Sequence, residues 1–367
     1  MQQHKSARTG GTKDQVLILN VAPETAELCA RSAIEAAATI DATIEEAPEQ
    51  FAREGADLLS RTLDRACLAA VDQLGRASQV SAVALMGLCA IPAPPAIDPA
   101  AVDSRELKGH DLLLAGVMHL AGTEPTFIPM QNHGQVARTV SPKPRGPDLG
   151  GSHGTKTFNW HQDSPWHRAE GDGPMEPGTP TMPAQLAIEA MRNEELTPTI
   201  VLTVDDLLRE VPQSIQDQLR RAAFRIAPPD PAFGGEKALR PILYDRDGRD
   251  MLRFDPYLAR AEDQDAIEAI FTLGLALGKA APRAVPITLD AGSVLIFDNR
   301  RIMHMRPAFS PLEPGRQRWL RSFYGRGVPV HTRAWRMFLD TGLKYIGQKM
   351  MPAQVPGVFR LPAPTKR

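Results

Sequence analysis

Cysteine is scarce in this sequence of 367 residues, and its three copies, Cys29, Cys67 and Cys89, lie far apart. Three scattered thiols cannot build a disulfide framework, and no CxxC pair is present that would indicate a zinc ribbon. This cysteine usage is typical of proteins in a reducing compartment. We therefore expect the protein to be cytoplasmic.

An excess of charge of one sign is also missing, because the formal net charge is −1. Neither nucleic acid nor a membrane surface is therefore an expected partner. The first residues lack the apolar region of a secretory signal, and no stretch approaches the ~18 apolar residues that a membrane span needs. With 43% hydrophobic residues the chain can bury a large core as one elaborated domain.

The order of patterns along the chain predicts an α+β fold in one domain over 15–367, preceded by a flexible tail over 1–14. About 20–80 carries apolar residues at helical spacing, as in Leu59, Leu63 and Cys67. About 80–330 reads as short strands broken by proline and glycine, with helices expected within 203–223 and over 265–279. A C-terminal segment over 330–367 completes the chain. The Pro/Gly-rich stretch 171–183 is expected to be a loop that acts as an active-site lid.

Two histidines and one aspartate are the candidates for catalysis. His161 and Asp163 are two residues apart, so on an extended strand both point to one side while Gln162 points away. His304 follows a Gly-started apolar strand and an Asp-Asn turn, which predicts a hairpin over 292–306 that delivers the imidazole to the same point. Two imidazoles and a carboxylate can occupy one face of iron(II) and leave the other open, as in oxygen-activating enzymes.

A basic strand follows shortly after this hairpin. It contains the run Arg318-Trp319-Leu320, so the Arg318 guanidinium is expected on the strand next to the metal ligands. A guanidinium can hold a carboxylate through two parallel hydrogen bonds. An iron oxygenase that uses 2-oxoglutarate needs such a group for its co-substrate.

Taken together, His161-x-Asp163, His304-x-Arg306-x-x-Phe309 and Arg318-Trp319-Leu320 resemble the motifs of the iron(II)/2-oxoglutarate dioxygenases of the taurine-dioxygenase superfamily. The likeness runs from about 80 to 326 and is greatest to the clavaminate-synthase-like branch, which hydroxylates free amino acids such as arginine and asparagine.

This resemblance implies a double-stranded β-helix, or jelly roll, with flanking helices. It also implies Fe(II), 2-oxoglutarate and O2 as the reacting groups, with Arg318 and Thr199 binding the co-substrate. The implied activity is hydroxylation of an unactivated C–H bond of an amino acid or amino-acid-like small molecule in specialised metabolism.

The chain departs from that branch where the substrate is held. Ser322 stands where the amino-acid hydroxylases carry an arginine for the substrate carboxylate, and strand parity directs Arg321 away from this face. Arg138 stands where the family often has a glutamine, so we hypothesise that it binds the anionic group of the substrate. A solvated surface arginine is the alternative. Asp255 resembles an acidic position that meets a cationic side chain, and it also fits a simple turn residue before proline.

Other interpretations of these residues stay open. His153, His161 and His167 are a rival set of ligands that could bind zinc. The same iron oxidant could desaturate or cyclise the substrate instead of hydroxylating it. A non-catalytic small-molecule-binding protein on the same scaffold is the alternative from a different class.

Overall fold

The protein is described here by a computed structural model, which defines residues 15–75, 79–129, 131–143, 151–169, 172, 179–233 and 238–327. These residues all belong to one compact unit. The tail expected over 1–14 and the segment expected over 330–367 lie outside the described residues, as does most of the 171–183 loop. The single domain over 15–367 stays a prediction. Among the described residues, no helix combines the length and the apolar content needed to cross a membrane.

Four helices form a layer on the N-terminal side of the chain: α1 (Pro23–Thr39), α2 (Pro48–Thr62), α3 (Arg65–Gly75) and α4 (Lys108–Leu120). Helices α2 and α4 touch through glycine, because a Cβ atom on Gly55 would lie 1.9 Å from the Leu112 carbonyl oxygen. A Cβ on Gly116 would lie 2.4 Å from the Gly55 backbone. Neither position can therefore accept a side chain without separating the helices.

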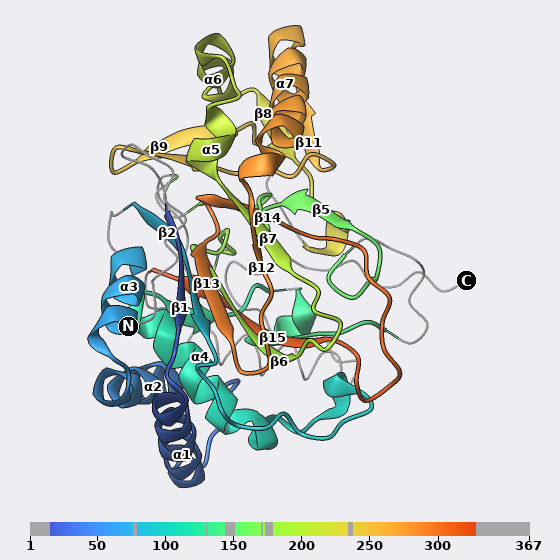
Figure 1. Ribbon diagram of the computed structural model, residues 1–367. Coiled ribbons are helices and arrows are strands. Elements are labelled where there is room, and N and C mark those ends of the chain that lie inside the picture. Colours follow the sequence, from blue (N-terminus) through green and yellow to red (C-terminus); the bar gives the residue numbers. More distant parts are fainter. Residues whose placement is uncertain are drawn as a thin grey trace, which may run out of the picture. The chain divides into compact units, whose positions relative to one another are not determined.

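A seven-stranded sheet lies against α4, and the order of its main path is β1-β2-β13-β6-β15-β3, with β4 paired to β15 (Figure 1). The strand β1 was not expected from the sequence and pairs in parallel with β2, whereas the other pairings are antiparallel. These strands are β1 (Gln15–Asn20), β2 (Val80–Met86), β3 (Glu124–Thr126), β4 (Ala137–Val140), β6 (Gln185–Arg192), β13 (Val294–Asp298) and β15 (Trp319–Arg326).

A second, four-stranded sheet has the order β12-β7-β14-β5. Its strands are β5 (Phe158–His161), β7 (Thr199–Thr203), β12 (Val285–Ile287) and β14 (Ile302–Arg306). Val201 and Ile302 of this sheet belong to the same buried apolar cluster as Leu186, Leu295 and Leu320 of the large sheet. The two sheets therefore face each other across a shared core.

The hairpin predicted over 292–306 is wrong in its pairing. β13 pairs with β2 and β6 of the large sheet, whereas β14 pairs with β7 and β5 of the small one. The tight turn between them, in which the Arg301 N–H donates to the Asp298 carbonyl at 3.0 Å, sends the chain from one sheet to the other. Sequence spacing alone cannot separate these two outcomes, because the same turn residues serve both.

Helices inserted between the strands build a second core. They are α5 (Val204–Leu208), α6 (Gln213–Leu219) and α7 (Gln264–Ala280), which confirms the helices expected at 203–208 and 265–279 (Figure 1). The helix expected to run to 223 ends at Leu219, whose carbonyl accepts the Ile242 N–H instead of continuing the helix. The remaining elements are β8 (Phe224–Ile226), β9 (Leu243–Arg246), β10 (Arg249–Leu252), β11 (Ala259–Ala261) and five short 3-10 helices, Pro99–Ala101, Ser104–Leu107, Asn132–Gly134, Pro231–Phe233 and Ala281–Arg283.

Candidate metal centre

His161, Asp163 and His304 come together at one point of the small sheet. Strands β5 and β14 are antiparallel neighbours, and His161 lies directly opposite His304 in their register. The ligand atoms of the three side chains all lie within 4.8 Å of one another, and His304 Nε2 is 3.9 Å from Asp163 Oδ2. The side chains expected to meet at one metal ion do meet.

The protonation of these histidines suits a metal. His161 Nδ1 donates to the Asn159 carbonyl at 2.6 Å, which leaves the lone pair of Nε2 free. His161 Nε2 and His304 Nδ1 are both buried and have no hydrogen-bond partner. Burial and the adjacent His161 lower the pKa of His304 to about 3, so its imidazole is neutral at physiological pH. Buried nitrogens without partners are costly, and a divalent ion could bind His161 Nε2, the Asp163 carboxylate and one ring nitrogen of His304.

A second group of donors, Cys89, His110 and Glu189, also converges within the described ranges. Here His110 Nδ1 lies 2.6 Å from Glu189 Oε1 and 3.4 Å from Cys89 Sγ, so these atoms are already hydrogen bonded to one another. Burial and the nearby Glu189 charge raise the pKa of the Cys89 thiol. Through these bonds the group forms a buried polar contact between α4 and the large sheet, although His110 Nε2 and Glu189 Oε2 have no hydrogen-bond partner.

The rival zinc ligands do not converge. His153, His161 and His167 are not among the groups of described donors that meet at a point. His153 Nδ1 bonds to the Ser141 carbonyl at 3.1 Å, and burial alone lowers the pKa of His167 to about 4. The zinc interpretation is therefore wrong for this arrangement, because the irregular chain around 153 and 167 directs their rings elsewhere.

Arg318 is buried, with 4% of its surface exposed. The expectation that it lies on the strand next to the metal ligands is wrong, because it precedes β15 of the large sheet, whereas His161 and His304 lie in the small one. Burial and the neighbouring Arg306 charge lower the pKa of Arg318 to about 10, and its Nε has no hydrogen-bond partner. Arg306 is two residues after His304 on β14, and its guanidinium donates to backbone carbonyls, including that of Gly151 at 3.1 Å. Two buried guanidinium groups that repel each other favour a bound anion, although the Glu195 carboxylate already offsets part of the charge at Arg318.

Thr199 begins β7 and is buried. The β7–β14 register pairs Val201 with His304, which places Thr199 on the same face as His304, two residues along the strand. The position expected for a co-substrate hydroxyl is thus on the metal side of the small sheet.

Arg138 lies directly across from Ser322 in the β4–β15 register. Its guanidinium stacks over the Tyr324 ring, with 4.5 Å from Cζ to the ring centroid. After burial and His161, the Arg138 charge is a further cause of the lowered His304 pKa, so this arginine is near the metal ligands. Arg138 is half-buried, which does not fit the alternative of a solvated surface side chain.

Asp255 and Arg321 occupy different environments. Burial raises the pKa of Asp255, while its Oδ1 accepts the Tyr257 N–H at 2.8 Å, as the turn interpretation requires. The nearby His161 side chain opposes this rise, so Asp255 lies close enough to interact with one of the three candidate ligands. Arg321 points to the opposite face of β15 and bonds Asp111 of α4, Nη2 to Oδ2 at 2.8 Å. The expectation that Arg321 cannot replace the missing cation is confirmed.

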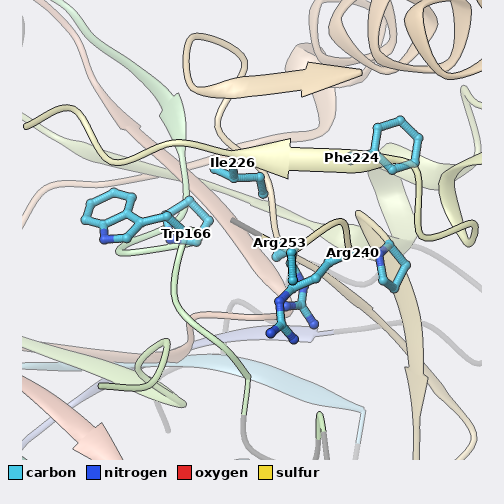
Figure 2. A pocket seen from close by; sticks show the side chains of 8 residues that line it. Trp166, Phe224, Ile226, Arg240 and Arg253 are labelled. Atoms are coloured by element: carbon cyan, nitrogen blue, oxygen red, sulfur yellow. The ribbon is translucent and has the colours of Figure 1, made fainter. Parts of the chain in front are cut away.

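A pocket beyond the first metal strand is lined by Pro165, Trp166, Phe224, Ile226, Ala238, Arg240, Pro241 and Arg253. Figure 2 shows the two arginine side chains next to each other, with Trp166 farther along the pocket. Both guanidinium groups bond the Asp172 carboxylate, Arg253 at 2.8 Å and Arg240 at 3.1 Å. One carboxylate thus offsets one of the two positive charges, and the pocket keeps a net positive charge.

Comparison with known proteins finds relatives that resemble part of this chain in sequence. Residues 207–324 match the sequence profile of the family described as taurine catabolism dioxygenase TauD, TfdA family. An L-asparagine oxygenase of Streptomyces coelicolor is 30% identical over 203 residues, which are 54% of this chain and 56% of that protein. Clavaminate synthase 2 of Streptomyces clavuligerus is 36% identical over 104 residues, 28% of this chain and 30% of that protein. The chain thus matches about half the length of its asparagine oxygenase relative, and less of the synthase.

Solved structures extend the likeness to most of the chain. An asparagine oxygenase in complex with Fe(II), a hydroxyasparagine and succinate aligns with a TM-score of 0.69 at 21% identity, covering 84% of this chain and 92% of that one. The non-heme iron oxygenase OrfP with Fe and alpha-ketoglutaric acid aligns with a TM-score of 0.70 at 23% identity, covering 86% and 96%. The resemblance to the iron(II)/2-oxoglutarate dioxygenases is confirmed: the described chain has the mixed helix-and-sheet fold of these oxygenases, and its segment 207–324 matches the TauD, TfdA family.

Proposed function

We propose that the protein is a non-haem iron(II)- and 2-oxoglutarate-dependent oxygenase that hydroxylates an unactivated C–H bond of an amino acid or amino-acid-like small molecule. The observation that carries this proposal is the convergence of His161, Asp163 and His304, with buried nitrogens that lack partners. We also propose that the two facing sheets form a double-stranded β-helix, and that the enzyme is cytoplasmic and serves specialised metabolism. The names of its relatives, among them an enduracididine beta-hydroxylase of Streptomyces hygroscopicus, support this assignment.

Each residue has a distinct part in the proposed reaction. His161, Asp163 and His304 would hold the iron, which together with 2-oxoglutarate and O2 supplies the oxidation of the C–H bond. Arg318 pairs with the far carboxylate of 2-oxoglutarate, and Thr199 donates a hydrogen bond to it. Because Arg318 and Thr199 are both buried, their bonds to the co-substrate form away from competing water.

The substrate is held from two sides. Arg138 binds an anionic group at the place left by Ser322, since residues directly opposite on adjacent strands project from the same face. Asp255 binds a cationic group, and a bound ammonium or guanidinium would offset the desolvation that raises its pKa. An amino acid with a basic side chain carries both groups.

The assignment is tested by adding iron(II) and 2-oxoglutarate to the metal-free protein without oxygen. We expect the weak visible metal-to-ligand charge-transfer band, followed by succinate release when oxygen and an amino acid with a basic side chain are supplied. A product with an added hydroxyl separates hydroxylation from desaturation or cyclisation. A band without any amino-acid-dependent turnover would favour a non-catalytic binding protein, and no band would overturn the cofactor assignment.

Replacing Arg138 by alanine is expected to raise the KM for substrate about 10- to 100-fold, with little change in the KM for 2-oxoglutarate. The physical reason is the loss of a charge-assisted hydrogen bond, worth about 1.5–3 kcal/mol. Steady-state kinetics with each substrate varied in turn measures the effect.

The matched test moves the positive charge from β4 to the adjacent strand β15, on the same face of the sheet. Because Ser322 lies opposite Arg138 on the same face, the double variant Arg138→Ala with Ser322→Arg should recover most of the lost substrate affinity. Equal effects of Arg138→Ala on both KM values, or no recovery in the double variant, would show that Arg138 does not hold the substrate.

A further inference from the structure

Asn299 is a fully buried asparagine in the turn between β13 and β14, outside the set of proposed ligands. Its Oδ1 accepts the Asp163 N–H at 2.9 Å, and its Nδ2 donates to the Asp163 carbonyl at 2.9 Å and to the Pro183 carbonyl at 3.1 Å. Its own N–H donates to the Ala184 carbonyl at 2.9 Å. Each polar group of the side chain therefore has a backbone partner, two of them on a single residue.

Those two bonds replace a missing part of the sheet. Strand β5 ends at His161, so Asp163 lies beyond the last residue that ladder hydrogen bonds hold in place. A side-chain amide offers one acceptor and one donor side by side, as a neighbouring strand would. Asn299 thus gives Asp163 the pairing that the sheet gives to His161 and His304.

Gln162 extends the same arrangement. Its Nε2 donates to the Asn299 carbonyl at 2.6 Å, and its Oε1 accepts the Phe254 N–H at 2.8 Å, next to Asp255. With only 1% of its surface exposed, this side chain faces away from the metal ligands, as strand parity predicts. The two amides join the first metal segment, the turn before His304 and the segment that carries Asp255.

We propose that Asn299 is a positioning residue: by holding the backbone of Asp163 against the turn that leads to His304, it fixes the spacing of the ligands and thereby sets the affinity for the metal. The inference rests on the proposed metal centre and assigns a task to a residue that does not touch the metal. Loss of a residue that orients a ligand typically weakens metal binding 10- to 100-fold.

The test is a titration of the metal-free protein with cobalt(II), followed by visible absorption, without 2-oxoglutarate or turnover. Asn299→Ala is expected to raise the cobalt Kd at least 10-fold. The matched control is Asn193→Ala, because buried Asn193 makes an equivalent set of bonds, Nδ2 to the carbonyls of Thr197 at 3.1 Å and Leu289 at 3.0 Å, and Oδ1 from the Thr197 N–H at 3.2 Å. That control should lower the Tm of the metal-free protein to a similar extent and change the cobalt Kd less than about 3-fold.

The outcomes separate the two proposals. Failure of the wild type to bind cobalt contradicts the metal centre itself. Wild-type binding with an unchanged Kd in Asn299→Ala, or with equal losses in both alanine variants, contradicts the positioning role. If Asn299→Ala does not fold, Asn299→Ser, which keeps a hydroxyl at this position, replaces it. Its cobalt Kd is then compared with that of Asn193→Ala in the same way.

Discussion

The metal-free His304→Ala variant is expected to bind iron(II) at least 100-fold more weakly than the wild type and to show neither the charge-transfer band nor succinate release. His304 lies on β14 between β5 and β7, and among the described residues no other histidine belongs to this group of donors. Only His161 and Asp163 remain as ligands, which is too few for a closed face of the metal. Anaerobic titration with iron(II) and 2-oxoglutarate measures the loss.

His167→Ala is the control for this prediction, because His167 is also buried and also has a lowered pKa, about 4, but lies outside the metal trio. It should keep the band at wild-type intensity. Iron binding that survives in His304→Ala and disappears in His167→Ala would reverse the assignment and favour the ligands His153, His161 and His167.

The second prediction concerns the stability of the fold rather than activity. Arg321→Ala should lower the free energy of unfolding by about 3–5 kcal/mol, because it leaves the Asp111 carboxylate buried without its cation. Asp111 is 0% exposed, and two nitrogens of Arg321, Nε and Nη2, bind its two oxygens. Urea unfolding of the metal-free protein measures the change.

A surface arginine provides the comparison for that measurement. Arg316 pairs with Glu194 and Glu313, but its side chain is 55% exposed, so Arg316→Ala should lower the free energy of unfolding far less than Arg321→Ala does. The double variant Asp111→Leu with Arg321→Met should regain much of the loss, since it removes both buried charges. Equal losses of unfolding free energy in Arg321→Ala and Arg316→Ala would contradict the special contribution of the buried pair to stability.

Local pattern predicted that His161 and Asp163 lie together, whereas the hairpin predicted to bring His304 to them is wrong. Side-chain alternation along an extended backbone predicted that His161 and Asp163 point one way and Gln162 and Arg321 the other, although Asp163 itself lies beyond the end of β5. The helices at 203–208 and 265–279 follow from local sequence in the same manner. These features depend only on residues that are neighbours in the chain.

Features that depend on which strands pair could not be predicted from the sequence. The position of Arg138 opposite Ser322 requires β4 and β15 to be neighbours in a known register, and no turn joins them in sequence. The same limit hid the role of Asn299, which appears in the sequence only as an ordinary turn residue. It also made the chain over 292–306 look like a hairpin when its strands lie in different sheets.

The turn between β13 and β14 connects the two sheets. One of its ends belongs to the large sheet and the other to the small sheet, and Asp298 braces it by accepting the Arg300 N–H at 2.9 Å and binding the Arg300 guanidinium. We expect a link held by these bonds to bend little, so that a change in the separation of the two sheets would shift His304. Substitutions in the shared core at Leu320 or Leu295, which are not candidate ligands, would thus change the affinity for the metal by moving His304.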